Sequence, residues 1–591
     1  MFGFFHKQVR YFLVSIRKKL SENQFLHIAC VVVGLSSASA AIVLKLFAFH
    51  IHRLIERSTQ GGVWPYLYVL LPAIGIFFTV WFINQILKGN FFKGNDKIIY
   101  AIAKKSSILP LSQIYSHVIT SAITVGSGGS AGLESPIVAT GAAIGSNFAR
   151  TYYLSYKERT LLLACGVAGG IAAAFNAPIA GVLFALEVFL IDVSINAFIP
   201  LIIAAASGAL LSKVILKEGI LLYFNLQEPF NYNNVPFYIV LGILAGFVSL
   251  YYAKVFTMLE HKLAGIQLKY KRALIGALLL AVLILFFPSL FGEGYTSITS
   301  LATMRPEKIF EKSIVKDFFT NEWLIFMGVT LVMFFKVFAA AFTIGGGGNG
   351  GNFAPSLFVG AYLGFAFATL LKLLGIHNIP VSNFTIVAMA GILSGVVYAP
   401  LTGIFLIAEI TGGYELMIPL MIVSAISYMI VKAFEPVSME MKNLVLHRNV
   451  HMHDKDKFLL SRLEVDELIE TDYDRIDENQ QLLNIVTIIT TSKRNTFPVV
   501  DKKGKLLGII KLINIKSIVF QPELNKKIYA KELMEKPPAV IELTEDLNSI
   551  MDKFDTTGVD QLPIVDKEVY IGFMSKASLL TRYRKEILDS F

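Results

Sequence analysis

Long apolar stretches recur along the first three quarters of the chain. Several approach the roughly 20 residues that a helix needs to cross the hydrocarbon of a bilayer, and others are shorter or are interrupted by glycine and proline. The pattern predicts an all-α polytopic membrane domain over residues 25–440. The stretches lie at 27–51, 64–87, 106–125, 159–191, 196–215, 236–257, 272–291, 323–344, 352–375, 384–411 and 414–434.

Composition and charge support this interpretation. Of the 591 residues, 54% are hydrophobic and 16% are charged, against about 25% charged residues in soluble proteins. The net charge of +10 is scattered over loops and ends, which favours cytoplasmic loop charge over a nucleic-acid partner. Residues 1–24 mix aromatic and basic side chains. They predict an amphipathic helix on the cytoplasmic membrane face, with both chain termini inside.

The apolar region consists of two related halves, at about 25–215 and 233–440. The segment AGGIAAAFNAPIAGVLFALE (168–187) aligns with AGILSGVVYAPLTGIFLIAE (390–409) at a constant offset. Related halves with corresponding glycine- and proline-interrupted segments are typical of transporters and point to a site between the halves. After a polar linker at 441–460, residues 461–591 repeat a strand–turn–strand–helix unit, which predicts a soluble tandem α/β module.

Two glycine-rich segments, 121–149 and 337–371, each run into a proline. Each predicts a loop that enters a helix N-terminus at membrane depth. The first N–H groups of a helix have no partner within it, and the helix dipole adds positive charge there. Two such helix starts facing one cavity are expected to hold an anion weakly, without any lysine or arginine. No GK[ST] follows either segment, which argues against a nucleotide-binding loop.

Glu134 is the single charge in the first of these segments. A carboxylate at this depth costs about 2.5 kcal/mol or more unless it is solvated or paired. We predict that the ionised side chain occupies the positive site and excludes chloride, and that the protonated side chain leaves it. The alternative is a buried, protonated and hydrogen-bonded acid. Glu187 and Glu409 occupy equivalent places in the two halves, and paired structural acids are the preferred interpretation for both.

These motifs resemble those of the CLC family of chloride channels and chloride/proton exchangers. The resemblance rests on GLESP (132–136), GNFAP (351–355) and AAFNAPIAGVLFALE (173–187). It implies an inverted-repeat pore fold and a homodimer with one pore per subunit, which moves chloride and protons and is not an enzyme. It also implies that Glu134 is the gate. The implied anion path comprises Gly132, Leu133, Glu134, Gly351, Asn352, Phe353 and Ala354.

Both side-chain ligands of the family's central anion site depart from the pattern. The serine position falls at Lys93 or Gly94, and the tyrosine position falls at Val437 or Glu440. Asn352 either supplies a replacement amide donor or only satisfies the backbone of its own loop.

The family's internal proton-transfer glutamate is Val188 here, and valine does not relay protons. This favours a proton-gated passive chloride channel. The alternatives are a chloride/proton antiporter of the same fold and, from another class, an organic-anion transporter or nutrient sensor with a wider cavity.

The tail resembles a pair of CBS domains, which often bind adenine nucleotides. The ribose-binding aspartates of that pattern are Asn514 and Ser578 here, which argues against nucleotide binding and for a dimerising or gate-coupling role. Linker histidines without cysteine or a defined geometry are usually solvated, so no metal or other cofactor is expected. These are His447, His451 and His453. We expect the protein in the plasma membrane of a prokaryote.

Overall fold

The computed structural model describes residues 20–590, with gaps at 61–66, 92, 191–194, 217–228, 320, 377, 443, 445–459, 461–462, 464 and 519–520. Its contacts divide the chain into two compact units, Met1–Asn443 and Leu444–Phe591. Most of the helix predicted over 1–24 lies outside the described residues, as does most of the linker predicted over 441–460 with its three histidines.

The first unit is helical, as the apolar stretches predict. Its first half contains α2 (Glu22–Gln60), α3 (Leu71–Gln85), α4 (Asn95–Lys104), α5 (Ser112–Gly126), α6 (Glu134–Thr151), α7 (Tyr156–Phe175), α8 (Pro178–Phe189) and α9 (Ile195–Leu216). Its second half contains α10 (Val235–Ala264), α11 (Lys269–Phe286), α12 (Tyr295–Ala302), α13 (Glu322–Gly345), α14 (Phe353–Leu373), α15 (Val381–Val397), α16 (Pro400–Ile410) and α17 (Met417–Phe434). Within the described ranges, eight helical stretches are long and apolar enough to cross a membrane.

Two apolar stretches that read as continuous, 159–191 and 384–411, are each broken into two helices. α7 stops at Asn176 and α15 stops at Tyr398, and both residues adopt left-handed backbone angles, with φ of 54° and 66°. In each case an alanine follows, and a proline then begins α8 or α16. A left-handed residue ends a helix and proline suits the first turn of the next one. The two halves therefore share the same broken-helix pair.

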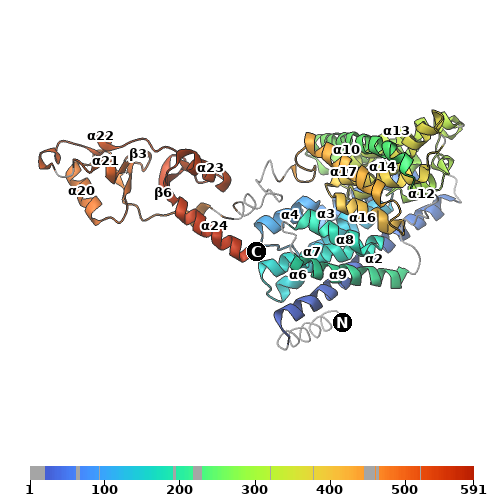
Figure 1. The fold of residues 1–591 in the computed structure, drawn as a ribbon, viewed down its shortest axis with the longest axis horizontal. Coiled ribbons are helices and arrows are strands. Elements are labelled where there is room, and N and C mark those ends of the chain that lie inside the picture. Colours follow the sequence, from blue (N-terminus) through green and yellow to red (C-terminus); the bar gives the residue numbers. More distant parts are fainter. Residues whose placement is uncertain are drawn as a thin grey trace. The chain divides into compact units, whose positions relative to one another are not determined.

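Close helix packing repeats in both halves. A Cβ added at Gly141 of α6 would lie 2.3 Å from the Gly166 carbonyl oxygen of α7, and one at Gly364 of α14 would lie 2.1 Å from the Phe384 oxygen of α15. Small residues allow such close backbone approach in membrane helices. Figure 1 shows the earlier helices, in blue to green, beside the later ones, in green to orange. The packed pairs α6–α7 and α14–α15 hold the two glycine-rich turns in place.

The second unit contains two similar α/β modules, as the tail repeat predicts. Each has a three-stranded sheet in which the first two strands pair parallel and the last two pair antiparallel, in the orders β1-β2-β3 and β4-β5-β6. The first module contains β1 (Ile476–Asp477), α20 (Leu482–Thr491), β2 (Thr496–Val500), β3 (Leu506–Lys511), α21 (Leu512–Ile515) and α22 (Ala530–Leu533). The second contains β4 (Ile541–Glu542), α23 (Leu547–Thr557), β5 (Gln561–Asp566), β6 (Val569–Ser575) and α24 (Lys576–Ser590).

Candidate functional site

The two glycine–proline turns meet at the centre of the first unit. Gly132 and Gly351 exchange a pair of backbone hydrogen bonds, each 2.9 Å long. α6 begins at Glu134 and α14 at Phe353, each two residues after its bridging glycine. A Cβ at Gly351 would lie 2.4 Å from the Cβ of Ser135, so the bridge requires glycine there. The structure thus brings together the predicted residues 132–134 and 351–354.

Glu134 lies buried at this junction, with 1% of its surface exposed. Its Oε1 accepts a 2.5 Å hydrogen bond from the Tyr295 hydroxyl. Its Oε2 has no hydrogen-bond partner among the described residues. A Cβ built at Gly132 would lie 2.2 Å from this oxygen and 3.0 Å from the Ala354 backbone nitrogen. One carboxylate oxygen is therefore held by a tyrosine, and the other lies between the two helix starts.

Phe353 occupies the place of Glu134 in the second half. Its ring is buried and lies 5.6 Å from the ring of Phe175 and 6.0 Å from that of Phe184. The two halves therefore present one acid and one aromatic ring at matching helix starts.

Asn352 contacts a tyrosine that the motifs did not indicate. Its Oδ1 accepts a 3.0 Å hydrogen bond from the hydroxyl of Tyr252 in α10, and the tyrosine is fully buried. The Asn352 side chain makes no capping hydrogen bond to α14. Because Tyr252 occupies the amide oxygen, the amide nitrogen is the group left to donate to a ligand. This geometry favours the amide-donor interpretation over the loop-satisfying one.

Two lysines that the motifs did not indicate lie near this junction. Lys336 of α13 is fully buried, and its Nζ donates to the Ser130 hydroxyl at 2.8 Å and to the Gly292 carbonyl at 3.1 Å. Lys45 of α2 donates to the Ala174 carbonyl, and its ammonium interacts electrostatically with Glu134. A lysine within the apolar α13 sequence was a visible signal, since ionisable residues at membrane depth are functional by default.

A second acid at this junction, Glu293, also escaped sequence reasoning. Its Oε1 accepts a 3.1 Å hydrogen bond from the backbone N–H of Leu133, one of the amides predicted to line the anion path. It interacts electrostatically with Glu134, Lys45 and Lys336. Glu293 lies outside the repeated motifs, and nothing in its local sequence indicated that it reaches α6.

The two positions proposed for the family tyrosine lie in the turn after α17. Glu440 Oε2 accepts a 2.9 Å hydrogen bond from the Asn95 amide, and Asn95 Oδ1 accepts a 3.3 Å bond from the Ser135 hydroxyl. Glu440 is thereby linked to the residue next to Glu134. Val437 lies in the same turn, and Val188 is the last residue but one of α8.

Glu187 and Glu409 hold helix starts in the opposite half. Glu409 accepts from the backbone N–H groups of Ile179 at 3.0 Å and Ala180 at 2.8 Å, at the start of α8. Glu187 accepts from the backbone N–H groups of Leu401 and Thr402, both at 2.9 Å, at the start of α16. Each acid thus caps the other half's broken helix, and these bonds support the structural interpretation.

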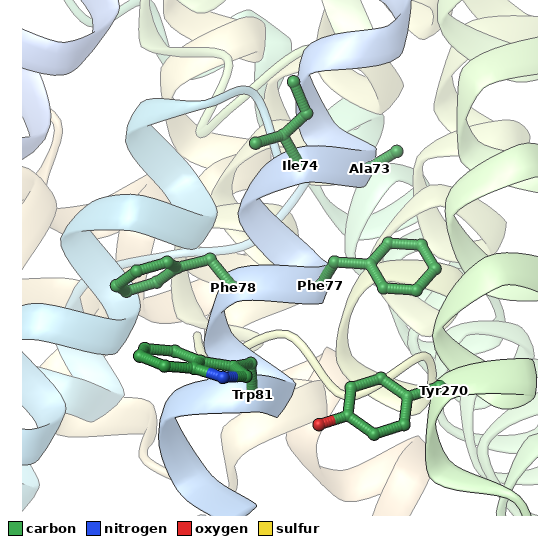
Figure 2. A pocket seen from close by; sticks show the side chains of 6 residues that line it. All are labelled: Ala73, Ile74, Phe77, Phe78, Trp81 and Tyr270. Carbon is green, nitrogen blue, oxygen red and sulfur yellow. The ribbon is translucent and has the colours of Figure 1, made fainter. Parts of the chain in front are cut away.

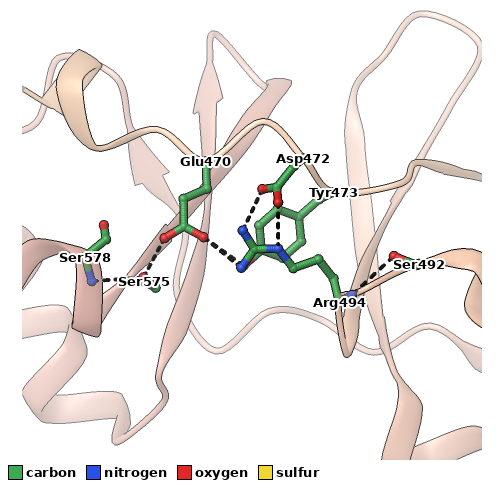
Figure 3. Close-up of polar contacts among 7 residues, drawn as sticks. All are labelled: Glu470, Asp472, Tyr473, Ser492, Arg494, Ser575 and Ser578. Carbon is green, nitrogen blue, oxygen red and sulfur yellow. Dashed lines mark hydrogen bonds and ion pairs between the residues drawn. The ribbon is translucent and has the colours of Figure 1, made fainter.

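The second unit carries a polar cluster built around Arg494. The guanidinium pairs with Glu470 at 2.9 Å and Asp472 at 2.6 Å, and lies 4.4 Å from the ring centroid of Tyr473 (Figure 3). The hydrogen bond from Arg494 holds the pKa of the Asp472 carboxyl below its ordinary value.

The two residues at the predicted nucleotide positions already have local contacts. The Ser578 backbone N–H donates to Ser575, whose hydroxyl donates to Glu470 at 2.5 Å (Figure 3). The Asn514 amide donates to Glu535 at 2.8 Å. Asn514 is thus bonded to an acid through its side chain, whereas Ser578 is bonded through its backbone and its hydroxyl has no partner among the described residues.

The first unit also contains an apolar groove. Figure 2 shows aromatic rings of α3 and Tyr270 of α11 around it. Among the described residues, the side chains that line it are apolar or aromatic. Its lining residues are Ala73, Ile74, Phe77, Phe78, Trp81 and Tyr270.

Apolar spans around two facing helix starts define an integral membrane protein built for small anions. The family model described as voltage gated chloride channel matches residues 75–432, and the CBS domain model matches 465–520 and 530–585. The chain therefore belongs to the CLC family of anion-transporting membrane proteins and carries a C-terminal pair of CBS domains.

This chain is similar both to relatives named as chloride channels and to relatives named as exchange transporters. A putative chloride channel protein ClcB-like from Ralstonia nicotianae is 29% identical, over 60% of this chain and 80% of its own length. The H(+)/Cl(-) exchange transporter ClcA of Vibrio cholerae is 28% identical, over 51% of this chain and 62% of its own length. A crystal structure of a eukaryotic CLC transporter matches with TM-score 0.61 at 18% identity, covering 94% of this chain and 97% of its own.

Proposed function

We propose that this protein moves chloride across the membrane and that Glu134 competes with chloride for the site between the α6 and α14 starts. The proposal rests mainly on the Glu134 carboxylate, which interacts with backbone N–H groups at the starts of both α6 and α14, those of Glu134 and Ala354. A carboxylate oxygen there stands where an anion would meet the free N–H groups of a helix start. Protonation removes the negative charge that holds the side chain, so the site becomes available to chloride.

Passive conduction is the first form of this proposal. A coupled exchanger needs a second acid to carry protons between Glu134 and the other side of the membrane, and Val188 replaces the family's acid. On this view protons only open the path, and chloride then moves down its own gradient. A homodimer with one pore per subunit stays a prediction.

Coupled exchange is a second candidate, and one observation favours it. Glu440 supplies an acid that is joined to Ser135 through Asn95 by hydrogen bonds of 2.9 and 3.3 Å. Ser135 directly follows Glu134 in the chain. Glu440 is therefore the acid that, in place of Val188, would bind and release protons near the start of α6.

The test of the gate is Glu134→Gln in reconstituted vesicles. Glutamine keeps the shape of the side chain but stays neutral at every pH, so it does not compete with chloride as an anion. We expect higher chloride flux at neutral pH and a flatter dependence of flux on pH. Chloride efflux measured across a pH series checks both.

The matched control is Glu322→Gln, which neutralises an exposed acid in the first turn of α13. This variant should keep the flux and the pH profile of the unmodified protein. A Glu134→Gln variant with an unchanged pH profile would reject Glu134 as the competing group.

A further inference from the structure

The segment Gly292–Tyr295 lies against the start of α6. The Gly292 N–H donates to the Gly128 carbonyl at 3.0 Å, which joins this segment to the glycine-rich turn that precedes Glu134. Gly292 and Gly294 have φ of 64° and 90°, so two glycines make the tight turn that begins α12. The turn places two neighbouring side chains, Glu293 and Tyr295, beside the same helix start.

Glu293 and Tyr295 bond to two neighbouring residues of the candidate site, Leu133 and Glu134. The Tyr295 hydroxyl donates to Glu134 at 2.5 Å, and Glu293 accepts from the Leu133 N–H at 3.1 Å. An anion entering from this side would need the Leu133 N–H that Glu293 holds. A hydrogen bond between a carboxylate and an N–H group is stronger than a neutral one, so the acid is a real competitor for that donor.

A buried lysine holds this segment in position. Lys336 Nζ donates to the carbonyl oxygens of Gly292 at 3.1 Å and Glu293 at 3.3 Å, and it lies 4.6 Å from the ring centroid of Phe358. Lys336 and Lys45 both interact electrostatically with Glu293. A buried charge is tolerated when opposite charges lie nearby, so the lysines make two carboxylates at one helix start possible.

We propose that Glu293 is a second carboxylate of the gate, which competes with the transported anion for the Leu133 amide while Tyr295 holds Glu134 in the closed position. This inference rests on the proposed role of Glu134. An entering anion meets two negative groups at close range, where like charges repel strongly. Full opening therefore requires that both acids be neutralised, and flux depends on two protonation steps. The charged or titratable groups facing Glu293 are Glu134, Tyr295, Lys45 and Lys336.

The experiment measures chloride efflux from vesicles containing the full-length protein across a pH series. Glu293→Gln should raise flux at neutral pH about tenfold, the factor that corresponds to loss of one hydrogen bond to a charged group. It should also make the rise in flux at low pH less steep. Glu134→Gln should keep a residual pH response, and the double variant should lose it. Glu293→Asp, which retains the acid, should restore part of the pH dependence.

Tyr295→Phe gives a second, independent readout. Loss of the hydroxyl donor disfavours the ionised Glu134 side chain, so the midpoint of the flux–pH curve should move to higher pH. Glu307→Gln, at an exposed acid of the same loop region, is the matched control and should change neither flux nor pH profile.

The inference fails if Glu293→Gln matches the unmodified protein and the double variant matches Glu134→Gln. That result leaves Glu134 as the sole gate and the proposed function intact. An unchanged pH profile in Glu134→Gln instead rejects the proposed function itself.

Discussion

At the scale of single residues, Glu440 is the acid whose neutralisation tests the two proposed forms of transport. It stands in the turn between α17 and the end of the first unit, and its Oε2 is bonded to Asn95. Burial raises the pKa of the Glu440 carboxyl to about 7, and the nearby acids Asp96 and Glu260 add to this rise. A carboxyl that exchanges its proton easily at this place suits a relay.

We expect Glu440→Gln to separate conduction from exchange. A proton route through Glu440 predicts that a chloride gradient drives uphill proton uptake in the unmodified protein. It also predicts that Glu440→Gln abolishes this uptake while chloride flux persists. Passive conduction predicts no uphill uptake in either protein. Simultaneous recording of chloride and proton movement in vesicles checks this.

Glu435→Gln is the control for that measurement. Glu435 lies in the same connection and pairs with Lys442 at 2.6 Å, away from the Asn95 contact. Its neutralisation should leave proton coupling unchanged. Equal loss of coupling in both variants would contradict a specific role for Glu440.

At the scale of elements, the reciprocal caps join the two halves of the membrane domain. α8 and α16 start at proline after a left-handed break, and neither start has a side-chain cap from its own N-cap residue. Glu409 and Glu187 supply the missing acceptors from the opposite half. Each carboxylate also meets the positive end of a helix dipole. The broken helices are therefore stabilised only when the halves are together.

Glu187→Gln should lower stability without changing the pH dependence of transport. In the variant, one carboxylate oxygen is replaced by an NH₂ group. The remaining oxygen still accepts from one backbone N–H, but the NH₂ group faces the other N–H, which is also a donor. We expect a loss of about 1.5–3 kcal/mol, the range for a hydrogen bond to a charged group. Thermal unfolding in detergent measures the loss, and vesicle efflux checks the pH profile. A shifted pH profile with unchanged stability would argue against a structural role.

The repeated elements could be predicted from sequence, because the glycine–proline turns and, after a small gap, the acids at 187 and 409 recur in the same order in both halves. The meeting of Gly132 and Gly351 follows from that symmetry. Glu293 and Tyr252 could not be predicted, because each reaches the site from a segment without a repeated motif. A hydrogen bond between residues 100 positions apart, as between Tyr252 and Asn352, depends on packing that no local pattern encodes.

At the scale of the whole molecule, the tail is a separate compact unit with its own cores. The Arg494 cluster ties Glu470 and Asp472 together, and Glu470 also accepts from Ser575. Acids occupy the contacts next to both predicted nucleotide positions, and a phosphate group is repelled by nearby carboxylates. Weak or absent nucleotide binding by the CBS pair stays a prediction, and so does its dimerising or gate-coupling role.

We expect ATP to bind the full-length protein weakly or not at all. Titration calorimetry in detergent should show no saturable heat at micromolar ATP. Arg494→Ala tests the cluster, because it removes the cation that balances the two acids and should weaken any residual binding further. Saturation in the micromolar range would overturn this prediction.

The reciprocal caps also set an order on biosynthesis. The ribosome makes Ile179 and Ala180 some 230 residues before Glu409, the acid that accepts from their N–H groups. Until residue 409 leaves the exit tunnel, the start of α8 lacks the acceptors it has in the finished protein. The first half therefore stays incompletely hydrogen-bonded in the bilayer until the second half has been made. A truncated nascent chain should be a target for quality-control proteolysis.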